Sequence, residues 1–386
     1  MTWDAIVVGA GIAGASVAFF LSDRYRVLLL ERESQPGYHS SGRSAAIYTE
    51  NYGSDTVSAL VRASGPFLKA PPRGFARGPL LEPLGVMTIC DEKQRDVFEA
   101  ALENARKRVS NLELHDTQFA LEKAPILRRE KIDQCFWEPD AFSIDVHSLH
   151  WGYIHGLISN GGSLVNGAAV TSIRRQNGKW HVVTAKGNEY CSPIIVNAAG
   201  AWADQIARLA GVVPVRLESR RRTAIIIDLP GGIDARKFPM VTEVGGSLYF
   251  RPMGVQLLVS PADAIPTPPS DVRPEELDVA IAIDRLVQLT TLQIGRIVHS
   301  WAGLRNFVAD ENPVVGWDES AKGFYWIVGQ GGAGIKTSPA LGMIAAANIL
   351  DDQVPLFLIA EGIAPESLYG RPSALPDTGL PFPRVT

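Results

Sequence analysis

The N-terminal stretch most constrains what this chain can fold into. Residues 4–8 are a short apolar run, residues 14–22 have the composition of a helix, and residues 26–31 (RVLLLE) form a second apolar run. Two strand-like segments with one helical segment between them are typical of a βαβ unit. We therefore predict that the chain begins with a Rossmann-like α/β domain.

A glycine motif lies inside this unit. The sequence GAGIAG places Gly9, Gly11 and Gly14 in GxGxxG spacing, and Glu31 ends the second apolar run. The first glycine permits a tight turn, the second lets a pyrophosphate approach the backbone, and the third permits close packing of helix on strand. A carboxylate in the position of Glu31 accepts hydrogen bonds from ribose hydroxyls. The alternative is a glycine-rich turn without a ligand, and the strand and helix around the motif favour a dinucleotide site.

Composition excludes several other classes of protein. The chain has 386 residues, enough for two domains, and its net charge of −4 argues against a nucleic-acid partner. Three widely spaced cysteines, Cys90, Cys135 and Cys191, give neither a metal site nor a disulfide framework, so we expect a reducing, cytoplasmic setting. The apolar N-terminal run is interrupted by glycines, which favours a soluble strand, turn and helix over an integral membrane segment.

Nucleotide-type elements recur in the middle and at the end of the chain. We predict a discontinuous FAD-binding domain (1–75, 140–212 and 311–362), an inserted α+β substrate-binding domain on a mainly antiparallel sheet (76–139 and 213–310) and a proline-rich tail (363–386). Helices are predicted for 91–109 and 274–290, strands for 220–230, 246–260 and 293–310, and further strands within 163–200. Asn177-Gly178 is a hairpin signal.

Two later features favour FAD over NAD. Residues 194–202 (IIVNAAGAW) are an apolar strand that ends in small residues, and residues 329–342 (GQGGAGIKTSPALG) are a second glycine loop that opens a helix. A helix N-terminus can stabilise the electron-rich edge of a flavin ring, and a nicotinamide enzyme does not need it. On the apolar run before this loop, Arg305 needs an anionic partner, for which a substrate carboxylate is suited.

The chain resembles the D-amino-acid oxidase family of FAD-dependent oxidoreductases, and within it most closely the bacterial D-arginine dehydrogenases. The resemblance extends in order from residue 5 to residue 342. Its stretches are IVVGAGIAGAS, LERESQPGYHSSGRSAA, YTENYG, VNAAGAWAD, RRRTA, SLYFRP, WAGLRNFVAD and QGGAGIKTSPALG.

The resemblance implies a cofactor site. Residues 42–46 would follow the FAD, Val170 would hold the adenine through its backbone, and residues 331–335 would face the isoalloxazine. For Arg43 a surface ion pair is an equal alternative. The loop offers no cysteine for attachment, so FAD should bind non-covalently. The candidates are Gly9, Gly11, Ala13, Gly14, Glu31, Arg32, Gly42, Arg43, Ser44, Ala45, Ala46, Val170, Gly200, Gly331, Gly332, Ala333, Gly334 and Ile335.

The resemblance also implies the catalytic residues. Arg305 and Arg222 would bind the substrate carboxylate, with Tyr249 as a hydroxyl donor to it. Gly332 would offer its carbonyl to the amine, and Tyr52 would close over the substrate. Without the resemblance, the sequence around Tyr249 would indicate an aromatic residue of the hydrophobic core. The two arginines next to Arg222 need another explanation, either exposure to solvent or acidic neighbours.

Two positions depart from the arginine enzymes. Ile47 stands where they carry a histidine, and Val86 stands where they carry the glutamate that binds the substrate guanidinium. A cationic side chain facing Val86 would be buried without a partner, which is costly. We therefore expect a neutral substrate.

The implied reaction is oxidative deamination of a D-amino acid to a 2-oxo acid and ammonia. A hydride would pass from Cα to flavin N5 and leave an imino acid. One alternative is a secondary-amine or opine oxidase subunit, and another is a non-catalytic or electron-transfer flavoprotein subunit. Quinone or dioxygen as electron acceptor and the need for a partner subunit stay open.

Overall fold

The first large element is a six-stranded sheet in the order β20-β21-β13-β1-β2-β9. The computed structural model describes residues 2–231, 233–363 and 368. All neighbours in this sheet are parallel except β20 and β21. The strands are β1 (Ala5–Val8), β2 (Val27–Leu30), β9 (Ser163–Val165), β13 (Ile194–Asn197), β20 (Val314–Trp317) and β21 (Phe324–Val328).

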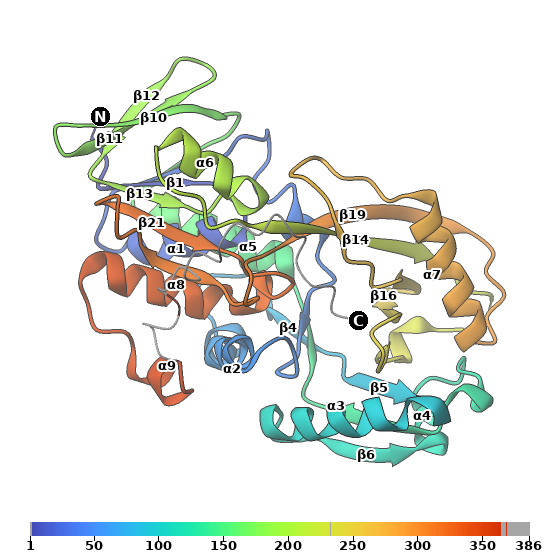
Figure 1. Cartoon of the computed structure of the whole chain (residues 1–386). Helices are drawn as coiled ribbons and strands as arrows, with labels where there is room; N and C mark the ends of the chain where they lie inside the picture. Colours follow the sequence, from blue (N-terminus) through green and yellow to red (C-terminus); the bar gives the residue numbers. More distant parts are fainter. Residues whose placement is uncertain (1, 232, 364–367, 369–386) are drawn as a thin grey trace.

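Both faces of this sheet are covered, because alternate side chains of each strand point to opposite sides. Ala5 and Val7 pack with the helices, whereas Ile6 and Val8 pack with Trp180 on the opposite face. Figure 1 shows helices α1, α5 and α8 on one side and the β10–β12 sheet with α6 above the other. The helices are α1 (Ile12–Leu21), α2 (Asp55–Lys69), α5 (Val146–Ser159), α6 (Ala203–Leu209) and α8 (Gly334–Leu350). The small sheet comprises β10 (Val170–Gln176), β11 (Lys179–Thr184) and β12 (Glu189–Ser192).

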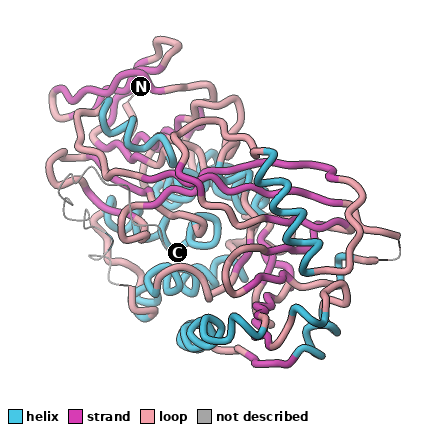
Figure 2. Tube along the Cα trace, turned by 45° about the vertical axis from the view of Figure 1, so that its right-hand side comes forward, coloured by secondary structure: helices cyan, strands magenta, loops and turns pink. Residues whose placement is uncertain are grey.

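The second large sheet has nine strands in the order β18-β14-β17-β16-β15-β5-β7-β6, with β19 also paired to β14. Its neighbours are antiparallel except β15 and β5, as the predicted mainly antiparallel sheet requires. The strands are β5 (Val86–Cys90), β6 (Glu113–Asp116), β7 (Gln134–Glu138), β14 (Glu218–Ile227), β15 (Met240–Glu243), β16 (Tyr249–Met253), β17 (Gln256–Ser260), β18 (Ile265–Pro266) and β19 (Ile297–Phe307). Figure 2 shows the strands of this sheet side by side, and α7 (Glu276–Leu289) contacts β14 and β17.

A small third sheet joins the two parts. Its strands are β3 (Ile47–Tyr48), β8 (Phe142–Ile144) and β4 (Leu81–Pro83). The remaining helices are α3 (Arg95–Arg108), α4 (Thr117–Lys123) and α9 (Leu356–Ala360). The short helical turns are η1 (Ser40–Arg43), η2 (Glu92–Gln94), η3 (Arg129–Lys131), η4 (Gly200–Trp202) and η5 (Ala235–Lys237).

Most of the predicted elements are present. The hairpin at Asn177-Gly178 joins β10 to β11, and both residues have the positive φ that such a turn requires. Helices α2 and α5 were not among the predicted elements, and α2 contains Pro66, a residue that normally interrupts a helix.

The strands of each large sheet come from a separate set of chain segments. Every strand of the β1 sheet lies within 1–75, 140–212 or 311–362, and every strand of the β14 sheet lies within 76–139 or 213–310. We propose these segments as the two domains. Most of the predicted tail lies outside the described residues. Among the described helices, none combines the length and apolar character needed to cross a membrane.

Candidate active site

The glycine turn lies between β1 and α1, where close packing explains two of its glycines. Gly9 has φ +102°, and a Cβ there would lie 2.6 Å from the Ala198 carbonyl oxygen. A Cβ on Gly14 would lie 1.8 Å from the Gly9 carbonyl oxygen. Gly14 therefore lets α1 pack against the turn, and Gly11, Ile12 and Ala13 at the N-terminus of α1 line the adjoining cavity.

Glu31 follows β2 and lies beside this turn. Its carboxylate accepts hydrogen bonds from the backbone N–H groups of Ala10 and Glu33, each at 2.9 Å. Burial raises the pKa of Glu31, and these two hydrogen bonds oppose the shift. The carboxylate is thereby fixed at the cavity wall, where it retains lone pairs for a ribose.

One cavity extends from the glycine turn to the N-terminus of α8. The predicted residues that line it are Gly9, Gly11, Ala13, Glu31, Arg32, Arg43, Ser44, Ala45, Val170, Gly200, Arg222, Tyr249, Arg305, Gly331, Gly332, Gly334 and Ile335. Gly14, Gly42 and Ala46 do not line it. A second, adjoining cavity is lined by Tyr52 and Ala333 and shares Arg222, Arg305, Gln330 and Gly332 with the first. Ile47 and Val86 line neither of these cavities.

The Arg43 side chain forms an ion pair, which is the alternative to a cofactor contact given above. It donates to the carbonyl oxygens of Val272 and Ala302, at 3.0 and 2.9 Å, and pairs with the half-exposed Asp271. Trp301 Nε1 donates to the Arg43 carbonyl oxygen at 3.2 Å. Arg43 therefore fastens the segment along the cavity to β19, although it also forms part of the cavity wall.

Arg222 and Arg305 come from the neighbouring strands β14 and β19 and line both cavities. Arg305 donates to the Tyr52 hydroxyl at 3.4 Å, and both Arg305 and Tyr249 line the first cavity. Burial opposes its charge, but Tyr52, Tyr249 and Asp263 outweigh burial and raise the pKa of Arg305. Burial and the nearby Arg305 lower the pKa of Arg222. Among the described residues neither guanidinium has a carboxylate in ion-pair contact, so together they can bind an anion.

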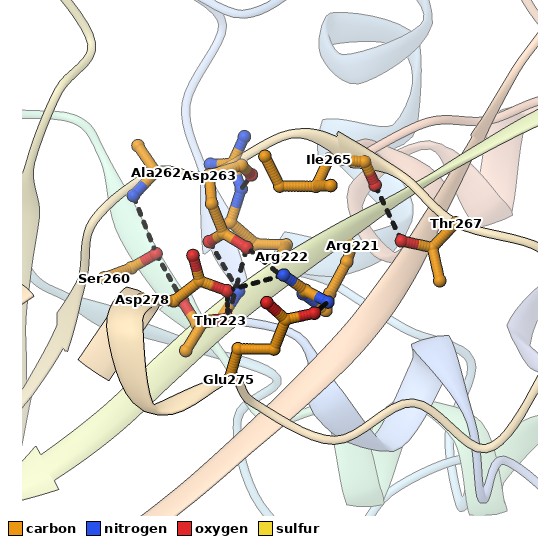
Figure 3. Close-up of polar contacts among 10 residues, drawn as sticks. All are labelled: Arg221, Arg222, Thr223, Ser260, Ala262, Asp263, Ile265, Thr267, Glu275 and Asp278. Atoms are coloured by element: carbon orange, nitrogen blue, oxygen red, sulfur yellow. Dashed lines mark hydrogen bonds and ion pairs between the residues drawn. The ribbon is translucent and has the colours of Figure 1, made fainter. Parts of the chain in front are cut away.

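The other two arginines of the run have acidic partners, as predicted. Consecutive residues of β14 point to opposite faces, which separates Arg221 from its two neighbours. Arg221 pairs with Glu275 and Asp278 on the side of α7 (Figure 3). Arg220 pairs with Glu218 and Glu311. Arg222 is therefore the member of the run that is free to bind an anion.

Asp263 holds Arg222 in place, as Figure 3 shows. Its carbonyl oxygen accepts from Arg222 Nε, which leaves the terminal guanidinium nitrogens to face the cavities. Its carboxylate accepts from the Thr223 N–H at 2.7 Å and from the Thr223 hydroxyl at 3.1 Å. No sequence signal marked Asp263, because the loop after β17 has no motif.

We expect Asp263→Ala to weaken substrate binding more than catalysis. The variant frees Thr223 and the loop whose carbonyl orients Arg222, and the loss of hydrogen bonds to a charged group corresponds to roughly a tenfold rise in KM. Steady-state kinetics with the best substrate measures the effect. Asp234→Ala is the matched control, because among the described residues the hydrogen bonds and ion pair of the Asp234 side chain are with the exposed Arg236 alone. Equal KM values for both variants would contradict the role of Asp263.

The second glycine loop completes the cavity. A Cβ on Gly332 would lie 2.1 Å from the Tyr52 hydroxyl and 3.0 Å from Arg305 Cζ. A Cβ on Gly331, whose φ is +54°, would lie 2.4 Å from the Phe307 ring. Gln330 Nε2 is buried and has no hydrogen-bond partner among the described residues. An unsatisfied donor beside a cavity wall fits a cofactor that presents acceptor atoms.

These features define a class of protein. A glycine turn at a helix N-terminus, a buried carboxylate beside it and a second glycine loop at another helix N-terminus are features of flavin-dependent oxidoreductases. The model of the family DAO, FAD dependent oxidoreductase, matches residues 4–348. The chain belongs to this family, and its cofactor is FAD.

Sequence relatives cover most of the chain at low identity. FAD-dependent oxidoreductase domain-containing protein 1 of Bos taurus is 24% identical over 90% of this chain and 81% of its own length. Sarcosine oxidase subunit beta of Rhizobium meliloti is 24% identical over 89% and 83%. Mitochondrial dimethylglycine dehydrogenase of Rattus norvegicus is 24% identical over 92% of this chain and 44% of its own length.

Solved structures share the fold. L-proline dehydrogenase from P. horikoshii has a TM-score of 0.79 at 21% identity and covers 94% of this chain and 98% of its own. Glycine oxidase from Geobacillus kaustophilus has a TM-score of 0.79 at 22% identity, with coverage of 91% and 95%. L-alpha-glycerophosphate oxidase from Mycoplasma pneumoniae, solved with FAD bound, has a TM-score of 0.83 at 18% identity, with coverage of 92% and 96%.

Proposed function

We propose that this protein oxidises a D-amino acid with a neutral side chain to a 2-oxo acid and ammonia. The observation that carries the proposal is the pair Arg222 and Arg305, two guanidiniums beside the cofactor cavity with no carboxylate partner among the described residues. An α-carboxylate that binds both would satisfy their charge through bidentate hydrogen bonds. The preference for the D rather than the L enantiomer stays a prediction, and so does the particular similarity of this chain to D-arginine dehydrogenases.

Each residue of the site has a role in this reaction. Arg222 and Arg305 bind the carboxylate, Tyr249 adds a hydroxyl, and Tyr52 covers the substrate next to Gly332. The Gly332 carbonyl orients the amine, which must be neutral for its lone pair to form the imine. FAD, bound non-covalently, supplies the two-electron acceptor for the hydride that leaves Cα. Water then hydrolyses the imino acid to the 2-oxo acid and ammonia, and quinone or dioxygen accepts the electrons.

A neutral side chain is favoured by what surrounds Val86. Val86 is buried in β5, directly opposite Glu138 in β7. The Glu138 carboxylate accepts hydrogen bonds from Thr49 at 2.6 Å and from Asn51 at 3.5 Å. The two hydrogen bonds fix this carboxylate to residues 49–51, and Val86 itself offers no acceptor atom to a cationic side chain.

A second candidate substrate is an N-substituted amino acid. Sarcosine oxidase subunit beta and dimethylglycine dehydrogenase, which are relatives of this chain, are named for N-methylated glycines. The same two arginines would bind such a carboxylate. Sarcosine oxidase subunit beta is by its name one subunit of a larger enzyme, so this second candidate function includes a partner subunit for the present chain. A cytoplasmic location is part of the proposal for both candidates.

Anaerobic flavin reduction tests the proposal. Purified protein is mixed with D- and L-amino acids of neutral and cationic type, N-methyl amino acids and opines, and the visible flavin band is followed. Bleaching by neutral D-amino acids supports the proposal, and bleaching by N-substituted amines alone supports the second candidate. A D-arginine kcat/KM above that of every neutral substrate would overturn the neutral preference. A flavin that no amine reduces would indicate a missing partner or a non-catalytic FAD.

A further inference from the structure

Two ionisable side chains lie buried next to the arginine pair, and the proposed reaction does not use them. Lys336, in the first turn of α8, is 4% exposed, and Glu138, at the end of β7, is 3% exposed. Buried charges are costly unless other groups stabilise them. Their contacts therefore indicate what each side chain does.

Lys336 contacts the ring of Tyr52. Its ammonium nitrogen lies 3.7 Å from the ring centroid, which is cation–π geometry. Among the described residues Lys336 has neither a hydrogen bond from its side chain nor an ion pair, so the ring is its main partner. The hydroxyl of the same ring accepts from Arg305. Tyr52 is thus held between the lysine and the arginine pair.

Glu138 holds the residues just before Tyr52. It accepts from the Thr49 hydroxyl at 2.6 Å and from Asn51 Nδ2 at 3.5 Å. The Thr49 hydroxyl oxygen also accepts from the Asn51 N–H at 3.1 Å. Residues 49–52 are therefore fastened at their start by a carboxylate and at their end by an ammonium.

We propose, on the basis of the proposed function, that Lys336 and Glu138 are positioning residues that hold Tyr52 over the arginine pair. Lys336 acts through the tyrosine ring, and Glu138 acts through Thr49 and Asn51. Neither side chain lines the two cavities around the pair, so neither is assigned a contact with the substrate.

This arrangement gives ligand binding a pH optimum. Burial lowers the pKa of Lys336 to about 7, with Glu138 opposing the shift and Arg305 adding to it. Burial raises the pKa of Glu138 to about 7, with Thr49, Asn51 and Lys336 opposing the shift and Glu50 adding to it. Above this range Lys336 loses the charge that attracts the ring, and below it Glu138 loses the charge that holds Thr49. Ligand affinity is therefore highest near pH 7 and falls on both sides.

Binding of isovalerate to the holoenzyme tests the proposal without turnover. Isovalerate has the carboxylate and side chain of valine but no amine, and its Kd is measured from the flavin spectrum between pH 6 and 9. Lys336→Met is expected to raise Kd about tenfold near pH 7 and to remove the loss of affinity at high pH. Lys336→Arg, which keeps the charge, is expected to restore most of the affinity. Lys322→Met at an exposed site is the control.

A Tyr52→Leu background separates positioning from direct contact. If Lys336 acts through the ring, adding Lys336→Met to Tyr52→Leu causes no further rise in Kd. A further tenfold rise, or an unchanged Kd in Lys336→Met alone, would overturn the proposal. If Lys336→Met does not fold, Glu138→Gln and Thr49→Val test the role of Glu138. Should the loss of isovalerate affinity at low pH be the same in Glu138→Gln as in the unmodified protein, the proposed role of Glu138 would be wrong. A flavin that binds isovalerate but is reduced by no amine would contradict the proposed function and leave the positioning result standing.

Discussion

Arg305→Met is expected to lower kcat/KM for the best substrate by about a thousandfold, because two charge-assisted hydrogen bonds to the carboxylate are lost. Arg305 donates a hydrogen bond to the Tyr52 hydroxyl, so the variant also removes a group that orients this hydroxyl. Its guanidinium has no carboxylate in ion-pair contact among the described residues, so the variant leaves no buried acid unpaired. Steady-state and anaerobic reduction kinetics measure the loss.

Two comparisons make this prediction specific. Arg305→Lys keeps one charge but not the planar pair of donors, so an intermediate loss is expected. Arg220→Met removes a nearby arginine that is already paired with Glu218 and Glu311, and it is expected to have a much smaller effect. FAD content and melting temperature are measured for each variant. If Arg305→Met and Arg220→Met lowered kcat/KM equally, the assignment of the carboxylate site would be wrong.

Gly14→Ala is expected to give protein with little or no FAD. A Cβ at this position would lie 1.8 Å from the Gly9 carbonyl oxygen and 3.2 Å from Ala198 Cβ, so α1 must move away from the turn. Overpacking of this kind costs roughly 3 kcal/mol of stability, and it displaces the helix N-terminus that we propose as the pyrophosphate site. FAD content after purification and the Kd for added FAD measure the effect.

Gly78→Ala is the matched control. Apart from its two chain neighbours, no atom of the described residues lies within 4 Å of a Cβ placed on Gly78, and Gly78 is exposed. The same chemical change is therefore expected to leave FAD content and melting temperature unchanged. Full FAD occupancy in Gly14→Ala would contradict the close packing of α1 on the turn.

Local sequence patterns predicted the parts of the site that depend on neighbours along the chain. The turn at Gly9 requires a positive φ, which glycine readily adopts, so the motif itself locates the turn. Arg305 was predicted because an arginine in an apolar strand needs an anionic partner. Arg222 was chosen from three arginines only through the resemblance, although alternation along β14 separates it from Arg221.

Groups fixed by tertiary contacts were not predicted. Asp263 reaches Arg222 across a sheet, and Glu138 and Lys336 approach residues 49–52 from strands and helices far away in the sequence. Lys336 stands out in the structure because a lysine is seldom this deeply buried. In the sequence, its place just after the second glycine loop was the only hint of a role. Ile47 and Val86 were chosen by resemblance, and the structure places them outside the two cavities, so their role in specificity stays a proposal.

The central claim is that the arginine pair binds the carboxylate of an amine that FAD oxidises. Its most direct test is anaerobic flavin reduction by the best neutral D-amino acid and by the carboxamide of that amino acid. The account predicts that the acid reduces the flavin at least about a hundredfold faster at equal concentration, since the amide has no charge to pair with Arg222 and Arg305. Equal rates with acid and amide would contradict it.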